Sequence, residues 1–115
     1  MEGLIRLSEA LELADRTDER WYVAELCRLR GEMLVTNADR PSAESWFSRA
    51  LAEAQKRRAK FFELRAATSM ARLWRDQSKQ DEARELLAPV YGWFTEGFDT
   101  RDLQEAKALL DDLAA

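Results

Sequence analysis

The chain matches itself when it is shifted by 40 residues along its own sequence. Positions with this spacing keep their identity in Ala10 and Ala50, Leu11 and Leu51, Ala14 and Ala54. Other positions keep their size, small in Gly3, Ala43 and Ala83 and large in Leu7, Phe47 and Leu87. A repeat of this length is typical of stacked supersecondary units rather than of one irregular core.

The composition decides which kind of unit is repeated. The 115 residues include 4 glycines and 2 prolines, so the chain has few of the residues that interrupt helices. Apolar residues recur at helical spacing in two stretches of each unit. The sequence therefore predicts an all-α fold of about six helices in antiparallel hairpins, at residues 3–16, 20–36, 41–58, 60–77, 80–96 and 100–114.

Several residues at the predicted boundaries suggest how the helices begin and end. Asp39 stands two residues before Pro41, which suits a cap followed by the first turn of a helix. Ser78 and Asp81 have the spacing of a capping box. Pro89 falls inside a predicted helix, where it lacks a donor for residue 85, so a kink or break is expected there.

The repeat has a family resemblance. Gly31, Leu34, Ala43, Phe47 and Ala50 have separations that resemble the tetratricopeptide (TPR) signature. A degenerate second copy contains Ala71, Trp74, Ala83, Leu87 and Val90. The period of 40 exceeds the usual period of about 34, which longer helices in each hairpin would explain. The resemblance implies a right-handed TPR-like solenoid.

The stretches 63–77 and 86–113 are also similar to the C-terminal TPR-like region of bacterial multidomain signalling and transcriptional regulators, in which a cyclase or DNA-binding domain and a predicted ATPase precede helical repeats. The resemblance implies a C-terminal fragment of such a protein, with no catalytic activity of its own. It further implies one domain over 1–115, divided into a half unit (1–17), a unit (18–58), a degenerate unit (59–98) and a capping helix (99–115).

The chain lacks most of the residue types and motifs that catalytic, metal and cofactor sites use. The chain has no histidine, a single cysteine (Cys27) and no glycine-rich phosphate loop. We therefore expect no catalytic residues, no bound metal and no cofactor. A lone cysteine suits a reducing cytoplasm, and no apolar run approaches the roughly 20 residues that span a bilayer. Acidic and basic residues are interspersed and the net charge is -4, which disfavours direct nucleic-acid binding.

A surface for a protein or peptide partner is the better expectation. The resemblance implies that the first helix of each hairpin lines a concave face. On that face Arg65, Thr68, Arg72 and Arg75 would form a stripe, with Glu25, Arg28 and Glu32 beside it at a shift of about 40 residues. Such arginines can bind the carboxylates of an acidic peptide, which could belong to another protein or to another domain of the parent chain. The alternative is a solvated helix face with local ion pairs.

Trp46 suggests a second possibility. It shares its register with Arg6 and Leu86, a position with no fixed demand for burial. It could therefore lie on an outer face and mediate self-association. The sequence thus favours a non-catalytic interaction or regulatory scaffold, and a homodimerisation module that uses Trp46 or an exposed end helix is the alternative.

Overall fold

The computed structural model describes residues 22–114, which form five α-helices and no strand. The helices are α2 (Val23–Thr36), α3 (Arg40–Lys56), α4 (Lys60–Asp76), α5 (Gln80–Gly92) and α6 (Arg101–Ala114). The prediction of an all-α fold is confirmed. The predicted helix at 3–16 lies outside the described residues.

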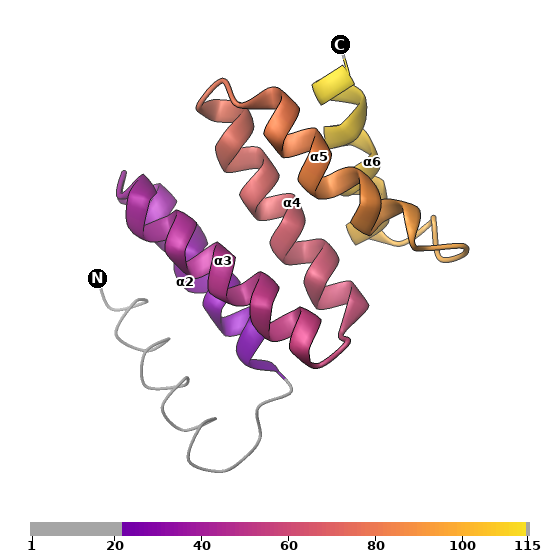
Figure 1. The fold of residues 1–115 in the computed structure, drawn as a ribbon, viewed down its shortest axis with the longest axis horizontal. Helices are drawn as coiled ribbons and strands as arrows, with labels where there is room; N and C mark the ends of the chain where they lie inside the picture. The colour runs from indigo at the N-terminus through magenta and orange to yellow at the C-terminus, as the bar shows by residue number, and fades with distance from the viewer. Residues whose placement is uncertain (1–21, 115) are drawn as a thin grey trace.

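The helices are arranged in two layers. Consecutive helices pack against each other, and in addition α2 contacts α4 and α4 contacts α6. No such contact joins α3 to α5 within the described part of the chain. Figure 1 shows α2 behind α3 and α6 behind α5, with α4 in the middle of the molecule. One layer therefore consists of α2, α4 and α6, and the other of α3 and α5.

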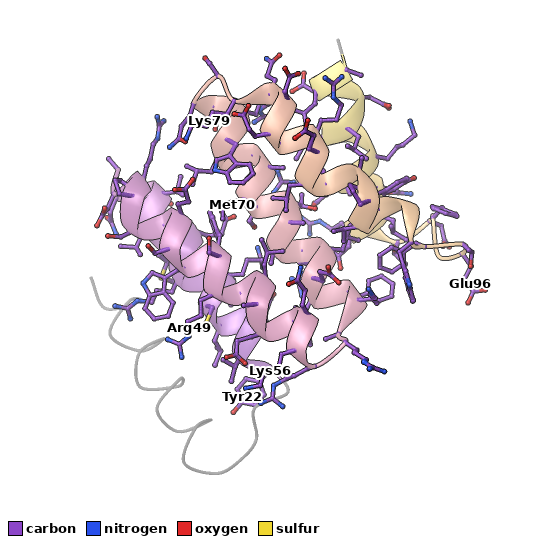
Figure 2. The ribbon with its side chains drawn as sticks, in the orientation of Figure 1. Tyr22, Arg49, Lys56, Met70, Lys79 and Glu96 are labelled. Atoms are coloured by element: carbon purple, nitrogen blue, oxygen red, sulfur yellow. The ribbon has the colours of Figure 1, made fainter. Side chains whose placement is uncertain are left out.

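The central helix α4 is the most buried element of the described fold. It contributes to all three apolar clusters, through Ala66 on the α2 side, Met70 on the α3 side and Leu64 on the side of α5 and α6. In Figure 2, Met70 lies on α4 inside the body, whereas Lys79 and Glu96 lie on loops at its edges. Small residues such as Ala67 and Ala71 allow the neighbouring helices to approach α4 closely.

The α2 and α3 helices approach each other closely at Gly31. A methyl group built on Gly31 would lie 2.5 Å from Cε1 and 2.6 Å from Cδ1 of Phe47, a ring with no exposed surface. The equivalent residues of the next unit are Ala71 and Leu87, which belong to one buried cluster. A larger residue on one helix is thus matched with a smaller residue on the other.

The three loops before α3, α4 and α5 share one backbone conformation. Each contains a residue with positive φ, at Ala38 (62°), Arg58 (54°) and Ser78 (63°). In the first loop, Ala38 N–H donates to Val35 at 2.9 Å and Asp39 N–H donates to Leu34 at 2.8 Å. The same two bonds recur in the other loops. They satisfy carbonyls at the helix end, a role usually given to glycine.

The structure of these loops tests the predicted N-caps of α3 and α5. Asp39 is the N-cap of α3 and its carboxylate accepts from Ser42 N–H at 3.3 Å, as predicted. The prediction of a capping box at Ser78 and Asp81 is wrong, because Ser78 adopts the left-handed conformation that ends α4. Lys79 is the N-cap of α5, and it makes no side-chain cap bond.

Pro89 does not break α5. The helix continues for three residues beyond it to Gly92, four residues short of the predicted end at 96. Pro89 and Glu85 are both exposed, so water can satisfy the carbonyl that loses its donor. The irregular segment lies later, at 93–100, where Phe94 is buried and contacts the rings of Phe61 and Trp93.

The described helices include none with the length and apolar character needed to cross a membrane. Cys27 is buried among apolar residues of the core.

The contact between Gly31 and Phe47 predicts that the effect of Gly31→Ala on stability depends on the residue at position 47. Gly31→Ala should lower the free energy of unfolding by about 1–2 kcal/mol, because the added methyl overpacks a closed contact. In a Phe47→Leu background the same change should be neutral or stabilising, because alanine favours the helix by up to about 1 kcal/mol. Urea unfolding of the four variants measures both effects. An equal effect of Gly31→Ala in both backgrounds would contradict the packing argument.

The left-handed turns predict that alanine-to-glycine changes have opposite effects on stability in a turn and inside a helix. Ala38→Gly should stabilise the fold by about 1 kcal/mol, because glycine adopts positive φ without steric cost. Ala52→Gly, at an exposed position inside α3, should destabilise it by about 0.5–1 kcal/mol. Thermal unfolding followed by circular dichroism gives the sign of each change. Destabilisation by both would show that the turn at Ala38 does not carry this strain.

Candidate functional site: a charged cavity on the α2, α4 and α6 layer

The layer formed by α2, α4 and α6 contains a cavity of about 320 Å³. Each of the three helices contributes polar or charged side chains to its lining, which consists of Arg28, Glu32, Arg65, Thr68, Ser69, Arg72, Arg101, Asp102 and Glu105. Five of the seven predicted partner-binding residues are in this set. Arg75 and Trp46 are not. The structure therefore brings most of the predicted stripe to one hollow surface.

The register between α2 and α4 explains this convergence. Glu25 Oε2 lies 2.8 Å from Arg65 Nη2, and Arg28 Nη1 donates to Ser69 Oγ at 3.3 Å. These residues are 40 and 41 positions apart, so the sequence repeat is also the spatial offset between the two helices. Residues three or four apart on each helix then share the wall of the cavity.

Arg65 connects three helices. Besides Glu25 of α2, it pairs with Asp102 of α6, with 3.6 Å between Nε and Oδ1. Glu25 also accepts two bonds from Arg28, at 2.7 and 2.9 Å. The bond to Glu25 raises the pKa of Arg28 above its ordinary value and outweighs the effect of burial, which lowers it. This end of the cavity is therefore closed by paired charges.

Glu105 accepts from two arginines at the other end. Arg101 Nε donates to Oε1 at 2.7 Å and Arg72 Nη2 donates to Oε2 at 3.4 Å. The bond from Arg101, together with the charges of both arginines, lowers the pKa of Glu105 despite some desolvation. Glu105 also raises the pKa of Arg101. Arg72 makes one contact only within the described residues, and that contact is long for a charged hydrogen bond.

The floor of the cavity carries two buried hydroxyl groups. Thr68 Oγ1 donates to the carbonyl of Leu64 at 2.7 Å, and Ser69 Oγ accepts from Arg28. The Thr68 proton is therefore committed to its own helix, although the side chain lines the cavity as predicted. Glu32 lines the α2 wall, and its carboxylate forms no ion pair with any residue of 22–114.

Arg75 continues the α4 stripe beyond the cavity. It pairs with Asp76 at 3.2 Å and with Asp112 of α6 at 3.1 Å. The arginines at 65, 72 and 75 thus each meet a carboxylate of α6. The ion pairs of these three arginines mostly join α4 to other helices, and Arg75 with Asp76 is a local pair of the kind expected as the alternative.

Trp46 lies elsewhere and is half-buried. Its ring packs on the cluster of Val23, Cys27, Ala50 and Ala66. The guanidinium carbons of Arg30 and Arg49 lie 4.6 and 5.2 Å from its ring centroid. Figure 2 places Arg49 at the edge of α3 away from α4. Side chains of the chain itself therefore cover much of Trp46, and its use in self-association stays a prediction.

Sequence reasoning missed four lining residues: Ser69, Arg101, Asp102 and Glu105. Three of them belong to α6. Its pairing with α4 joins residues 37, 33 and 37 positions apart, so the 40-residue offset does not predict these contacts. Ser69 lies four residues after Arg65 and three before Arg72, so helical spacing alone could have included it.

The described residues contain no cluster of three or more histidine, cysteine, aspartate or glutamate side chains able to hold a metal ion. The absence of catalytic and cofactor-binding residues stays an expectation from the sequence.

Comparisons with protein-family models, with curated proteins and with solved structures find no match to this chain.

The hydrogen bonds to Glu105 predict a lowered pKa for its carboxyl group. The Glu105 carboxyl should titrate below the usual glutamate range of about 4.3, and Arg101→Gln should move it upward because the larger contact is lost. A lowered folded-state pKa contributes stability above the unfolded-state pKa, and this contribution disappears as the pH falls through the folded-state value. Carboxyl NMR over the acidic range measures the midpoint. A midpoint unaffected by Arg101→Gln would contradict the assignment.

Proposed function

We propose that this chain is a non-catalytic protein-interaction module with a TPR-like solenoid arrangement, and that the α2, α4 and α6 layer receives a segment of a partner protein. The support for the arrangement is the two-layer contact pattern, in which alternate helices share one face. The 40-residue register and the matched crossings at Gly31 and Ala71 agree with it.

The observation that carries the proposal is the cavity itself. It gathers side chains from three helices into one hollow whose lining is almost wholly polar or charged. Among the described residues the lining has four guanidinium groups and three carboxylates, and the carboxylate of Glu25 beside it pairs with Arg28 and Arg65. Arg72 and Arg101 share the one carboxylate of Glu105, and this local excess of positive charge favours an acidic partner segment.

The setting in which such a module would act is also a proposal. The similarity of 63–77 and 86–113 to the C-terminal helical repeats of bacterial cyclase-type and ATPase-type regulators supports a regulatory role within a larger cytoplasmic signalling protein. In that setting the partner segment could come from another domain of the same chain. A segment of a separate protein and a segment of the same chain would bind to this face by the same contacts.

Binding of a fluorescein-labelled oligoglutamate peptide tests the proposal. Arg72→Gln should weaken binding about fivefold, equivalent to about 1 kcal/mol, because it removes a half-exposed guanidinium from the cavity. Arg84→Gln is the matched control, since Arg84 lies on α5 outside the cavity and, within residues 22–114, pairs with Asp81 of the same helix. Fluorescence anisotropy at low salt measures both dissociation constants.

An oligoglutamine peptide of equal length controls for non-specific association. The proposal fails if the acidic peptide does not bind the folded wild-type protein. It also fails if Arg84→Gln weakens binding as much as Arg72→Gln does, because the acidic peptide would then respond only to net charge.

A further inference from the structure

Glu105 occupies a site where two guanidinium groups converge. Arg101 lies one helical turn before it on α6, and Arg72 reaches it from α4. Each arginine uses a single nitrogen in this contact, and neither bonds another carboxylate of the described chain. All three side chains line the cavity. The arrangement is a carboxylate site whose present occupant comes from the chain itself.

The two ends of the cavity differ in how firmly their arginines are held. Arg28 uses three nitrogens, with Glu25 and Ser69 as acceptors. Arg65 binds carboxylates of two different helices. Each of these two arginines therefore bonds a side chain on a neighbouring helix as well as another acceptor. The contact of Arg72 is one bond of 3.4 Å between side chains that are 40% and 37% exposed, so water competes for it readily.

We infer that a carboxylate of an acidic partner peptide binds to Arg72 and Arg101 by displacing Glu105, so that Glu105 is an internal competitor that limits the affinity of the cavity. This inference rests on the proposed function. Glu105 can leave without loss of a buried contact, since more than a third of its side chain is exposed and both its partners are arginines at the cavity wall. Its place would be taken by a group of the same charge and geometry.

The charge state of Glu105 is consistent with this role. The arginine contacts lower its pKa, so the group is ionised at neutral pH and competes as a carboxylate. Only one partner of Glu105, Arg72, belongs to another helix. The fold therefore depends less on this pair than on Arg65, which joins α2 to α4 and α4 to α6.

Glu105→Gln tests the inference, because it removes the competing charge and leaves both arginines in place. Binding of the oligoglutamate peptide should tighten about two- to fivefold, the range expected for a half-exposed ion pair. Glu85→Gln makes the same change on the exposed surface of α5, and Asp102→Asn removes a carboxylate that lies in the cavity but pairs with Arg65. Both should change the affinity less than Glu105→Gln does.

A double variant isolates the site. The gain from Glu105→Gln should disappear in an Arg72→Gln background, since the freed guanidinium is then absent. Circular dichroism and urea unfolding of each variant establish that the compared proteins are folded.

The outcomes separate the two proposals. Wild-type binding that needs Arg72, with no gain or a loss in Glu105→Gln, overturns the inference and leaves the proposed function intact. An equal gain in Asp102→Asn also overturns it, because the effect would then come from the total charge of the cavity. Absence of binding to the folded wild type overturns the proposed function together with the inference.

Discussion

The close approach of Gly31 to Phe47 sets the spacing on which the described fold depends. A buried phenyl ring occupies the place where any other residue would carry its Cβ, so α2 and α3 lie closer than most side chains permit. In the next hairpin Ala71 and Leu87 share a buried cluster, again with the smaller residue on the first helix and the larger one on the second. Close-packed interiors tolerate little change in side-chain volume at such contacts.

The charged cavity depends on the repetition of the hairpins. Because the hairpins repeat, α2 and α4 lie side by side with an offset of about 40 residues, and Glu25 meets Arg65. The opposite side of α4 is apolar and packs on α3 and α5. One helix therefore separates a core from a polar hollow, and Arg65 joins the helices on both sides of that hollow. The same ion pairs that support the layer also reduce the number of guanidinium groups available to a partner.

Helix positions were largely predictable, because apolar periodicity and the cap at Asp39 are local properties. The errors have physical causes. Ser78 has the chemistry of an N-cap, but its backbone is used to end α4 in a left-handed turn that the sequence does not mark with glycine. Pro89 has the chemistry of a helix breaker, but its position on the exposed side of α5 leaves the lost carbonyl to water. In both cases solvent exposure or a neighbouring turn overrode the local preference.

The sequence by itself determined the helical class, the 40-residue register and the membership of Arg28, Glu32, Arg65, Thr68 and Arg72 in one stripe, because helical spacing and repetition are written along the chain. Only the tertiary structure decided that α6 contributes Arg101, Asp102 and Glu105 to the same cavity. It also decided that each arginine of the α4 stripe meets a carboxylate of α6. The physical reason is that the side chains of α4 and α6 meet at offsets of 33 and 37 residues rather than 40, and neither the repeat nor a local pattern encodes those offsets.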